Sequence, residues 1–370
     1  MFWQFDTGFI SQIDSLLDKE NVTLKELMEE EDILQECKSQ NQKLIQFIVR
    51  PVILEEMINL ITTEPPIDVN ERIRYKYANI ACEIMTSDVN PISDALVSDE
   101  SMLNKLYSFI DTDKQLNPLL ASFFSKVMGL LFVKRTEFVF EFLKTKDMIG
   151  LLLSHIETSA IMDLILKLII SVDNLELRNT IVKWLYDNNL ISKLLAIFKS
   201  NCSHQRHINA SQLICDIIKS SREHQSLLQD KVDGDLLLDT LESTETVSQL
   251  LENMFECRTE SCLVSGLSIL QSLLEYKRHC SENITSLDTE RLAKGVRQVQ
   301  AAIVPRLQDF TYLLLNPPHR DPIRTTVGII NKPLGATRLE VAHLFTALLS
   351  TNNLEIMEKL SELNTLSVLI

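Results

Sequence analysis

Glycine is scarce in this sequence, with eight residues in a chain of 370, against a usual share near 7%. Tight hairpins and phosphate-binding loops both depend on glycine, so we expect little β-structure and no nucleotide-binding loop. No glycine is placed to form G-x-x-x-x-G-K-S/T, G-x-G-x-x-G or the serine elbow G-x-S-x-G. The sequence therefore shows no motif for phosphate binding or for an activated serine, and we predict that the chain is not an enzyme.

Long apolar runs and an excess of positive charge are also missing. No apolar run approaches the roughly 18 residues that a membrane-spanning helix needs, and the net charge is -15. Because Lys and Arg must neutralise a phosphate backbone, this balance argues against nucleic-acid binding. We expect no nucleic-acid partner and no membrane association, but a chain that meets a basic partner or stays solvated.

The seven cysteines are odd in number and scattered, and no secretory leader precedes them. Free thiols in a reducing compartment are therefore expected. The best metal candidate is "NCSHQRH", where Cys202, His204 and His207 lie close together, with Cys215 eight residues further on. Zinc accepts these ligand types, but the spacing matches no common zinc motif. A polar connection before a helix is the favoured interpretation, and we predict no metal, cofactor or small-molecule substrate.

Helical periodicity is present almost everywhere, with apolar residues at spacings of three and four. One type of helix begins near a small residue, as in "NPLLASFFSKVMGLL", "TSAIMDLILKLII" and "NASQLICDII". Another type precedes each of these, as in "PVILEEMINLI", "SMLNKLYSFI" and "NLISKLLAIF". The first apolar positions of this second type are Val52, Met102, Met148, Leu190, Val247, Ile303 and Leu366.

These positions are 42 to 63 residues apart, and the shorter intervals match the roughly 40–47 residues of armadillo and HEAT units. One such helix pair cannot cover its own apolar faces, so neighbouring units must stack. We therefore predict an all-α, armadillo/HEAT-like helical-repeat solenoid, a right-handed superhelix. Residues 1–370 would form a single domain of about six to seven units.

The two ends of such a stack need covering. Phe2, Trp3 and Phe5 in "MFWQFD" are expected to seal the apolar end of the first unit, with direct partner docking as the minority alternative. The last segment, "LNTLSVLI", stops in the middle of a helical pattern. We therefore expect a domain that is truncated at its C-terminus.

Two groups of polar residues are candidates for partner contacts. In "ERIRYKYANI" basic residues alternate with tyrosines, a composition favoured at interface hot spots; the alternative is a solvated helix start with Tyr77 and Ile80 facing inward. A second group lies early in the helices near Ala121 and Ala210. The partner-binding candidates are Arg72, Arg74, Tyr75, Lys76, Asn117, Ser122, Ser125, Lys126 and Asn209.

Several stretches read together resemble the SAPS-domain proteins, the regulatory subunits of serine/threonine protein phosphatase 6. The resemblance runs in unbroken order from Met1 to about Leu349. The stretches that carry it are "MFWQFD", "LKELMEEEDILQECKSQNQKLIQFI", "IRYKYANIACEIMTSDV", "LNPLLASFFSKVMGLL", "HIETSAIMDLILKLI", "HINASQLICDII", "LLLNPP" and "PLGATRLEVAHLF".

This resemblance implies a non-catalytic subunit that binds the catalytic subunit of protein phosphatase 6, together with ankyrin-repeat regulatory subunits, in the cytoplasm and sometimes also in the nucleus. No residue-level binding motif carries over. A different interpretation is a generic armadillo-type adaptor that grips peptides of other partners. Such adaptors use a ladder of Trp and Asn, whereas this chain has only Trp3 and Trp184, which disfavours that alternative.

Overall fold

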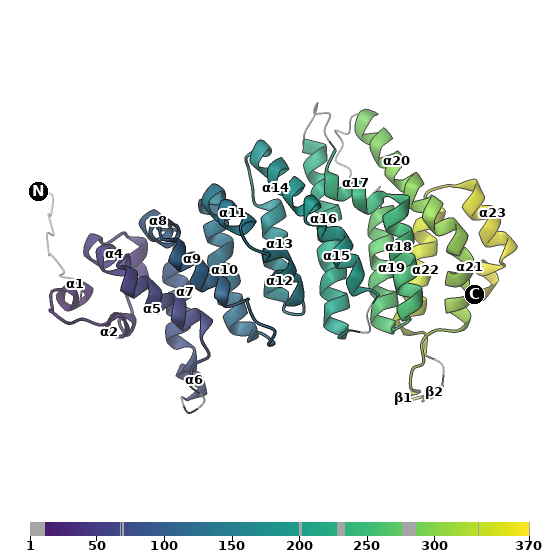
Figure 1. Cartoon of the computed structure of the whole chain (residues 1–370). Coiled ribbons are helices and arrows are strands. Elements are labelled where there is room, and N and C mark those ends of the chain that lie inside the picture. Colours follow the sequence, from purple (N-terminus) through teal and green to yellow (C-terminus); the bar gives the residue numbers. More distant parts are fainter. Residues whose placement is uncertain are drawn as a thin grey trace, which may run out of the picture. The chain divides into compact units, whose positions relative to one another are not determined.

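The computed structural model describes residues 12–66, 68, 70–199, 202–227, 234–275, 286–331 and 333–369. Its contacts divide the chain into two compact units, unit 1 (Met1–Val172) and unit 2 (Asp173–Ile370). Both are built almost entirely of helices, which confirms the all-α helical-repeat class (Figure 1). The predicted single domain over residues 1–370 and its right-handed superhelix stay predictions. The segment with Phe2, Trp3 and Phe5, predicted to cap the first unit, lies outside the described residues.

Unit 1 begins with a layer of short helices and continues with stacked groups of two or three. Its elements are α1 (Gln12–Leu17), α2 (Leu24–Met28), α3 (Ile33–Lys38), α4 (Gln42–Ile48), α5 (Pro51–Thr62), α6 (Glu71–Arg74), α7 (Lys76–Met85), α8 (Asn90–Ser98), α9 (Glu100–Ser108), α10 (Pro118–Lys134), α11 (Thr136–Lys144), α12 (Met148–Ser154) and α13 (Ser159–Ile170).

Unit 2 repeats the same arrangement and adds one small hairpin. Its elements are α14 (Leu175–Asp187), α15 (Leu190–Ile197), α16 (His204–Leu227), α17 (Leu236–Glu242), α18 (Thr244–Cys257), α19 (Glu260–Leu274), α20 (Ser286–Ile303), the 3-10 helix η1 (Val304–Arg306), α21 (Leu307–Leu315), β1 (Ile323–Thr325), β2 (Gly328–Ile330), α22 (Gly335–Ser350), α23 (Leu354–Glu362) and α24 (Thr365–Leu369).

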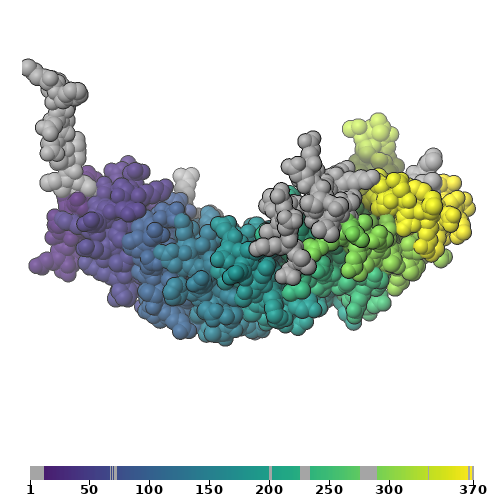
Figure 2. Space-filling model, turned by 90° about the horizontal axis from the view of Figure 1, so that it is seen from above, coloured from purple at the N-terminus to yellow at the C-terminus, as the bar shows by residue number. Residues whose placement is uncertain are grey.

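Both helix types expected from the periodicity are found, and a third helix precedes many of the pairs. The helices that carry the small residues Ala81, Ala121, Ala160, Ala210, Gly266 and Ala342 are α7, α10 and α13 in unit 1 and α16, α19 and α22 in unit 2. Helices α8, α11, α14 and α17 come before the pairs, as in three-helix armadillo units. Each unit forms a continuous packed body in the space-filling view, purple to blue for unit 1 and teal to yellow for unit 2 (Figure 2).

Local sequence explains where these helices begin. Asn117 accepts hydrogen bonds from the backbone amides of Leu119 (2.9 Å) and Leu120 (3.2 Å), and Pro118 takes the first helical position of α10, where its missing N–H costs nothing. Thr23 and Glu26 form a reciprocal capping box at α2. Side chains thereby satisfy amides that have no partner within the helix.

The cores contain large aromatic side chains and small contact residues. Phe124, Phe132 and Phe140 are fully buried in unit 1, and Phe198, Phe310 and Phe345 in unit 2. Ala81, Ala121 and Ala210 have no exposed surface, which allows the close helix approach expected from their size. None of the described helices is both long and apolar enough to cross a bilayer.

Candidate protein-interaction surface

Three of the predicted contact residues meet in unit 1, where α7 packs beside α10. The Tyr75 hydroxyl donates to Glu64 Oε2 (3.1 Å), and Asn117 Nδ2 donates to the Tyr75 hydroxyl (2.9 Å). Arg74 donates from Nη2 to the carbonyl oxygen of Pro65 (3.1 Å), and its guanidinium lies over the Tyr75 ring, 5.5 Å from the centroid. These contacts fix the side chains of Arg74, Tyr75 and Asn117 relative to one another.

Lys76 connects the start of α7 to the first helices of unit 1. Its ammonium donates to Glu29 Oε2 (2.5 Å), and the Tyr77 hydroxyl donates to Glu29 Oε1 (2.5 Å). The hydrogen bond from Lys76, followed by that from Tyr77, lowers the pKa of Glu29, and the bond to Glu29 raises the pKa values of Lys76 and Tyr77. Lys76 remains exposed at this link.

Two predicted contact residues are buried, which corrects their proposed position on a surface. Ser125 lies inside unit 1, where its hydroxyl donates to the carbonyl oxygen of Ala160 (2.7 Å) and joins α10 to α13. Asn209 is buried in unit 2 and accepts a hydrogen bond from Gln205 (2.8 Å). Ser125 thus links two helices, the bond to Asn209 lies within α16, and neither buried side chain is available to a partner in this structure. The Arg72 side chain lies outside the described residues.

The remaining candidates lie on the exposed side of α7 and α10. Lys126 is exposed and Ser122 is half-buried. Leu119, which the sequence interpretation did not single out, is 42% exposed between them and the cap residue Asn117. We call the exposed parts of Arg74, Lys76, Leu119, Ser122 and Lys126 the α7–α10 face. It combines three basic residues with an apolar side chain, a mixture suited to protein contact.

Of the four residues considered as zinc ligands, the structure brings Cys202 and His207 together and leaves His204 and Cys215 apart from them. Cys202 Sγ lies 3.4 Å from His207 Nε2, whereas His204 is exposed and Cys215 Sγ lies 3.8 Å from the carbonyl oxygen of Ser268. The structure adds two cysteines, Cys257 and Cys262, that the analysis of "NCSHQRH" missed. Their Cys-x-x-x-x-Cys spacing was a signal, but nothing in the sequence alone joined it to His207.

These features define the class of protein: an all-α helical-repeat chain with an exposed helical face. Residues 128–365 match the family described as "SIT4 phosphatase-associated protein" (SAPS), and the chain belongs to this family. The family match crosses the boundary between units 1 and 2.

Curated relatives extend the similarity to the whole sequence. The chain is 48% identical to human serine/threonine-protein phosphatase 6 regulatory subunit 2, over 100% of this chain and 39% of that protein. It is 46% identical to human regulatory subunit 1, over 98% of this chain and 43% of that protein. It is 32% identical to extragenic suppressor of kinetochore protein 1 of Schizosaccharomyces pombe, over 96% of this chain and 45% of that protein. The chain therefore spans less than half the length of these relatives, and no solved structure matches it.

Proposed function

We propose that this chain is the helical-repeat part of a non-catalytic regulatory subunit that binds the catalytic subunit of protein phosphatase 6. One observation carries this proposal: the chain belongs to the SAPS family, and its relatives at 46–48% identity are named regulatory subunits of that phosphatase. The absence of nucleotide-binding and serine-elbow motifs from the sequence agrees with a non-catalytic role.

The mechanism of such a subunit is positional. A stack of helices held together by buried apolar faces presents side chains at fixed places without reorganising. Binding a catalytic subunit on one part of the stack and a substrate on another raises the effective concentration of substrate at the phosphatase, with no new chemistry in the scaffold. Ankyrin-repeat regulatory subunits would join the same assembly, in the cytoplasm and nucleus.

We further propose that the α7–α10 face contributes to docking the phosphatase. The partly exposed Leu119 lies two residues after Asn117, which belongs with Arg74 and Tyr75 to a network of side chains that are already fixed. The exposed Lys126 lies about two turns further along α10. Side chains that are ordered before binding lose less entropy when the complex forms. A basic and apolar face can accept an acidic partner segment even though the whole chain carries a charge of -15.

The test is direct binding between the purified chain and the phosphatase catalytic subunit, measured by biolayer interferometry. The proposal expects saturable binding that Lys126→Glu weakens at least about tenfold, since one lost charge contact is worth about 1.4 kcal/mol or more. Lys144→Glu on α11 is the matched control, because it makes the same charge change at an exposed position and removes contacts within α11 alone, to the Glu141 carboxylate and the Phe140 ring.

The outcomes separate the two levels of the proposal. Absence of binding by the unmodified chain would reject the regulatory role for residues 1–370. Binding that Lys126→Glu and Lys144→Glu affect equally would retain that role and reject the α7–α10 face. Hydrolysis of a phosphate ester by the chain alone would contradict its non-catalytic nature.

A further inference from the structure

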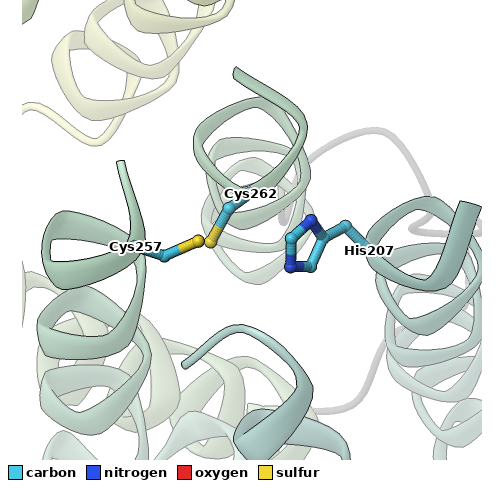
Figure 3. A group of neighbouring side chains, drawn as sticks. All are labelled: His207, Cys257 and Cys262. Carbon is cyan, nitrogen blue, oxygen red and sulfur yellow. The ribbon is translucent and has the colours of Figure 1, made fainter. Parts of the chain in front are cut away.

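Four side chains with soft or borderline metal-binding atoms converge in unit 2. His207 comes from α16, Cys257 from the end of α18 and Cys262 from α19, and their ligand atoms all lie within 4.8 Å of one another (Figure 3). Cys202, in the segment before α16, adds a fourth side chain, with Sγ 3.4 Å from His207 Nε2. We call Cys202, His207, Cys257 and Cys262 the Cys3His cluster. A set of three thiols and one imidazole is among the common ligand sets of structural zinc.

The imidazole of His207 has the orientation that a metal ligand requires. The ring is fully buried and stacks on Phe198, with centroids 5.8 Å apart. Nε2 lies beside the Cys202 sulfur, while Nδ1 lies 2.9 Å from the Ser261 hydroxyl. In protein zinc sites the ring nitrogen that does not bind metal is usually held by such a hydrogen bond, which fixes the tautomer. Ser261 can therefore keep the proton on Nδ1 and leave Nε2 as the ligand.

The spacing of the atoms fits a tetrahedral ion. With Zn–S distances of about 2.3 Å and Zn–N distances of about 2.0–2.1 Å, ligand atoms at the corners of a tetrahedron are about 3.5–3.8 Å apart. The separation of 3.4 Å between Cys202 Sγ and His207 Nε2 is close to this value, and the ligand atoms of His207, Cys257 and Cys262 lie within 4.8 Å of one another. Cys202 is outside that group of three, so its thiol has to turn toward the two other sulfurs to complete the tetrahedron. We infer that the Cys3His cluster binds one structural zinc ion.

Two of the three helix ends around the cluster favour the negative charge that such a site would carry, whereas Cys257 is the last residue of α18, where the dipole opposes it. Binding would release three thiol protons and leave Zn²⁺ with three thiolates and a neutral imidazole, a net charge of minus one. His207 lies in the first turns of α16, a helix of 24 residues, and Cys262 in the first turn of α19, a helix of 15 residues. Negative charge at helix N-termini is stabilised by the helix dipole. Cys202 is only partly buried, so an ion can reach the site from that side.

Two other interpretations account for less of the geometry. As plain buried thiols, Cys262 would donate to the carbonyl oxygen of Phe198 (3.2 Å) and Cys202 to that of Ile197 (3.7 Å), but thiols are weak donors. A disulfide between Cys257 and Cys262 would use two of the four groups and leave the placement of Cys202 and His207 unexplained. Zinc uses all four.

The experiment equilibrates the purified chain with Zn²⁺ under reducing conditions, removes unbound metal by desalting, and measures zinc by elemental mass spectrometry. We expect one zinc ion per chain, as for a four-ligand structural site. Replacement of zinc by Co²⁺ is expected to give the thiolate-to-cobalt charge-transfer band and the intense visible bands of tetrahedral coordination. These spectra are recorded on the unmodified chain, so they decide the question even if ligand variants fail to fold.

Variants then assign the ligands. Cys257→Ser and Cys202→Ser are expected to lose the zinc and weaken the cobalt bands, whereas Cys37→Ser, which alters a buried thiol in unit 1, is expected to retain one zinc. Ser261→Ala is expected to bind zinc about 10–100 times more weakly, the usual effect of removing an outer hydrogen bond to a ligand. The inference is overturned by an unmodified chain without bound zinc or tetrahedral cobalt bands, by full zinc content in Cys257→Ser, or by peptide mass mapping that finds a Cys257–Cys262 disulfide in place of metal.

Discussion

Arg222 is expected to be one of the most sensitive positions in unit 2. Its guanidinium is buried against the end of α19, donating to the carbonyl oxygens of Ser272 and Leu273 (2.8 Å each) and to Glu242 Oε1 (2.8 Å). Only 8% of the Arg222 side chain and 9% of that of Glu242 are exposed. Arg222→Met fills a similar space but leaves the Glu242 carboxylate buried without its cation. Breaking a buried pair in this way costs about 3–5 kcal/mol.

The double variant Arg222→Met, Glu242→Leu separates charge burial from packing. With both charges removed, no carboxylate is buried without a cation. The remaining loss of stability comes from the two α19 carbonyl oxygens that lose their hydrogen-bond donor, about 1–3 kcal/mol each at most. We therefore expect the double variant to be more stable than Arg222→Met alone. The assay is urea unfolding followed by tryptophan fluorescence in a Trp3→Phe background, where Trp184 reports on unit 2 alone.

The pH dependence provides a second check of the same reasoning. Burial raises the pKa of Glu242 above its usual 4.5, with Arg222 opposing the shift. An acid whose pKa is higher in the folded state holds its proton better there, so its contribution to stability falls as pH rises from 4.5 through the folded pKa. Removing Arg222 raises that pKa further, so the penalty of Arg222→Met should shrink on acidification towards pH 4.5. The explanation by an unpaired buried Glu242 carboxylate would be refuted by either of two results. One is that Arg222→Met lowers the free energy of unfolding by less than about 1 kcal/mol at neutral pH; the other is that this decrease does not change with pH.

Two further substitutions test the packing between stacked helices. Ser125→Ala should lower the free energy of unfolding by about 0.5–1.5 kcal/mol, because it removes one buried hydrogen bond to α13. Phosphatase binding should not weaken. Ser122→Ala, at a half-buried position of the same helix, is the control for stability, and an equal loss of stability in both variants would contradict the role of the buried bond. Gly266→Ala should cost about 1–3 kcal/mol, because a Cβ there would lie 2.9 Å from the sulfur of the buried Met254. Gly129→Ala meets only a flexible lysine side chain and should be neutral or stabilising by up to about 1 kcal/mol through helix propensity. Thermal unfolding followed by circular dichroism compares Gly266→Ala with Gly129→Ala. A similar change in melting temperature in both variants would argue against the steric explanation.

The helices themselves were predictable because their apolar spacing is regular over many turns. Val52, Met102, Met148 and Leu190 each lie at or near the start of an observed helix, because a face of apolar residues every three or four positions can be buried only in a helix. The sequence did not predict the third helices, such as α8 and α11. Two helices per unit already accounted for the longest series of apolar residues spaced by three and four.

The burial of Ser125 was visible in the sequence but was outweighed by residue type. Ser125 follows Ala121 by four positions and precedes Met128 and Phe132 by three and seven, so it lies on the same helical stripe as these buried residues. A serine near a helix start was interpreted as a surface contact, yet its small hydroxyl fits between close helices and finds a backbone acceptor. Periodicity was the better guide at this position.

The Cys3His cluster was beyond sequence reasoning because it depends on the register between units. The α16–α19 contacts join His207 to Ser261 and Ser211 to Ser265, pairs that are 54 residues apart, and Cys215 to Ser268, a pair 53 apart. In unit 1 the corresponding link from α10 to α13 spans 35 residues, and that from α7 to α10 spans 41. Loops of unequal length change this interval from unit to unit, so periodicity alone cannot say which residue of one helix faces which residue of the next. Once a single pair in α16 and α19 is known, the nearly constant interval of 53–54 places Cys262 opposite the turn that carries His207, because stacked helices keep their register over several turns.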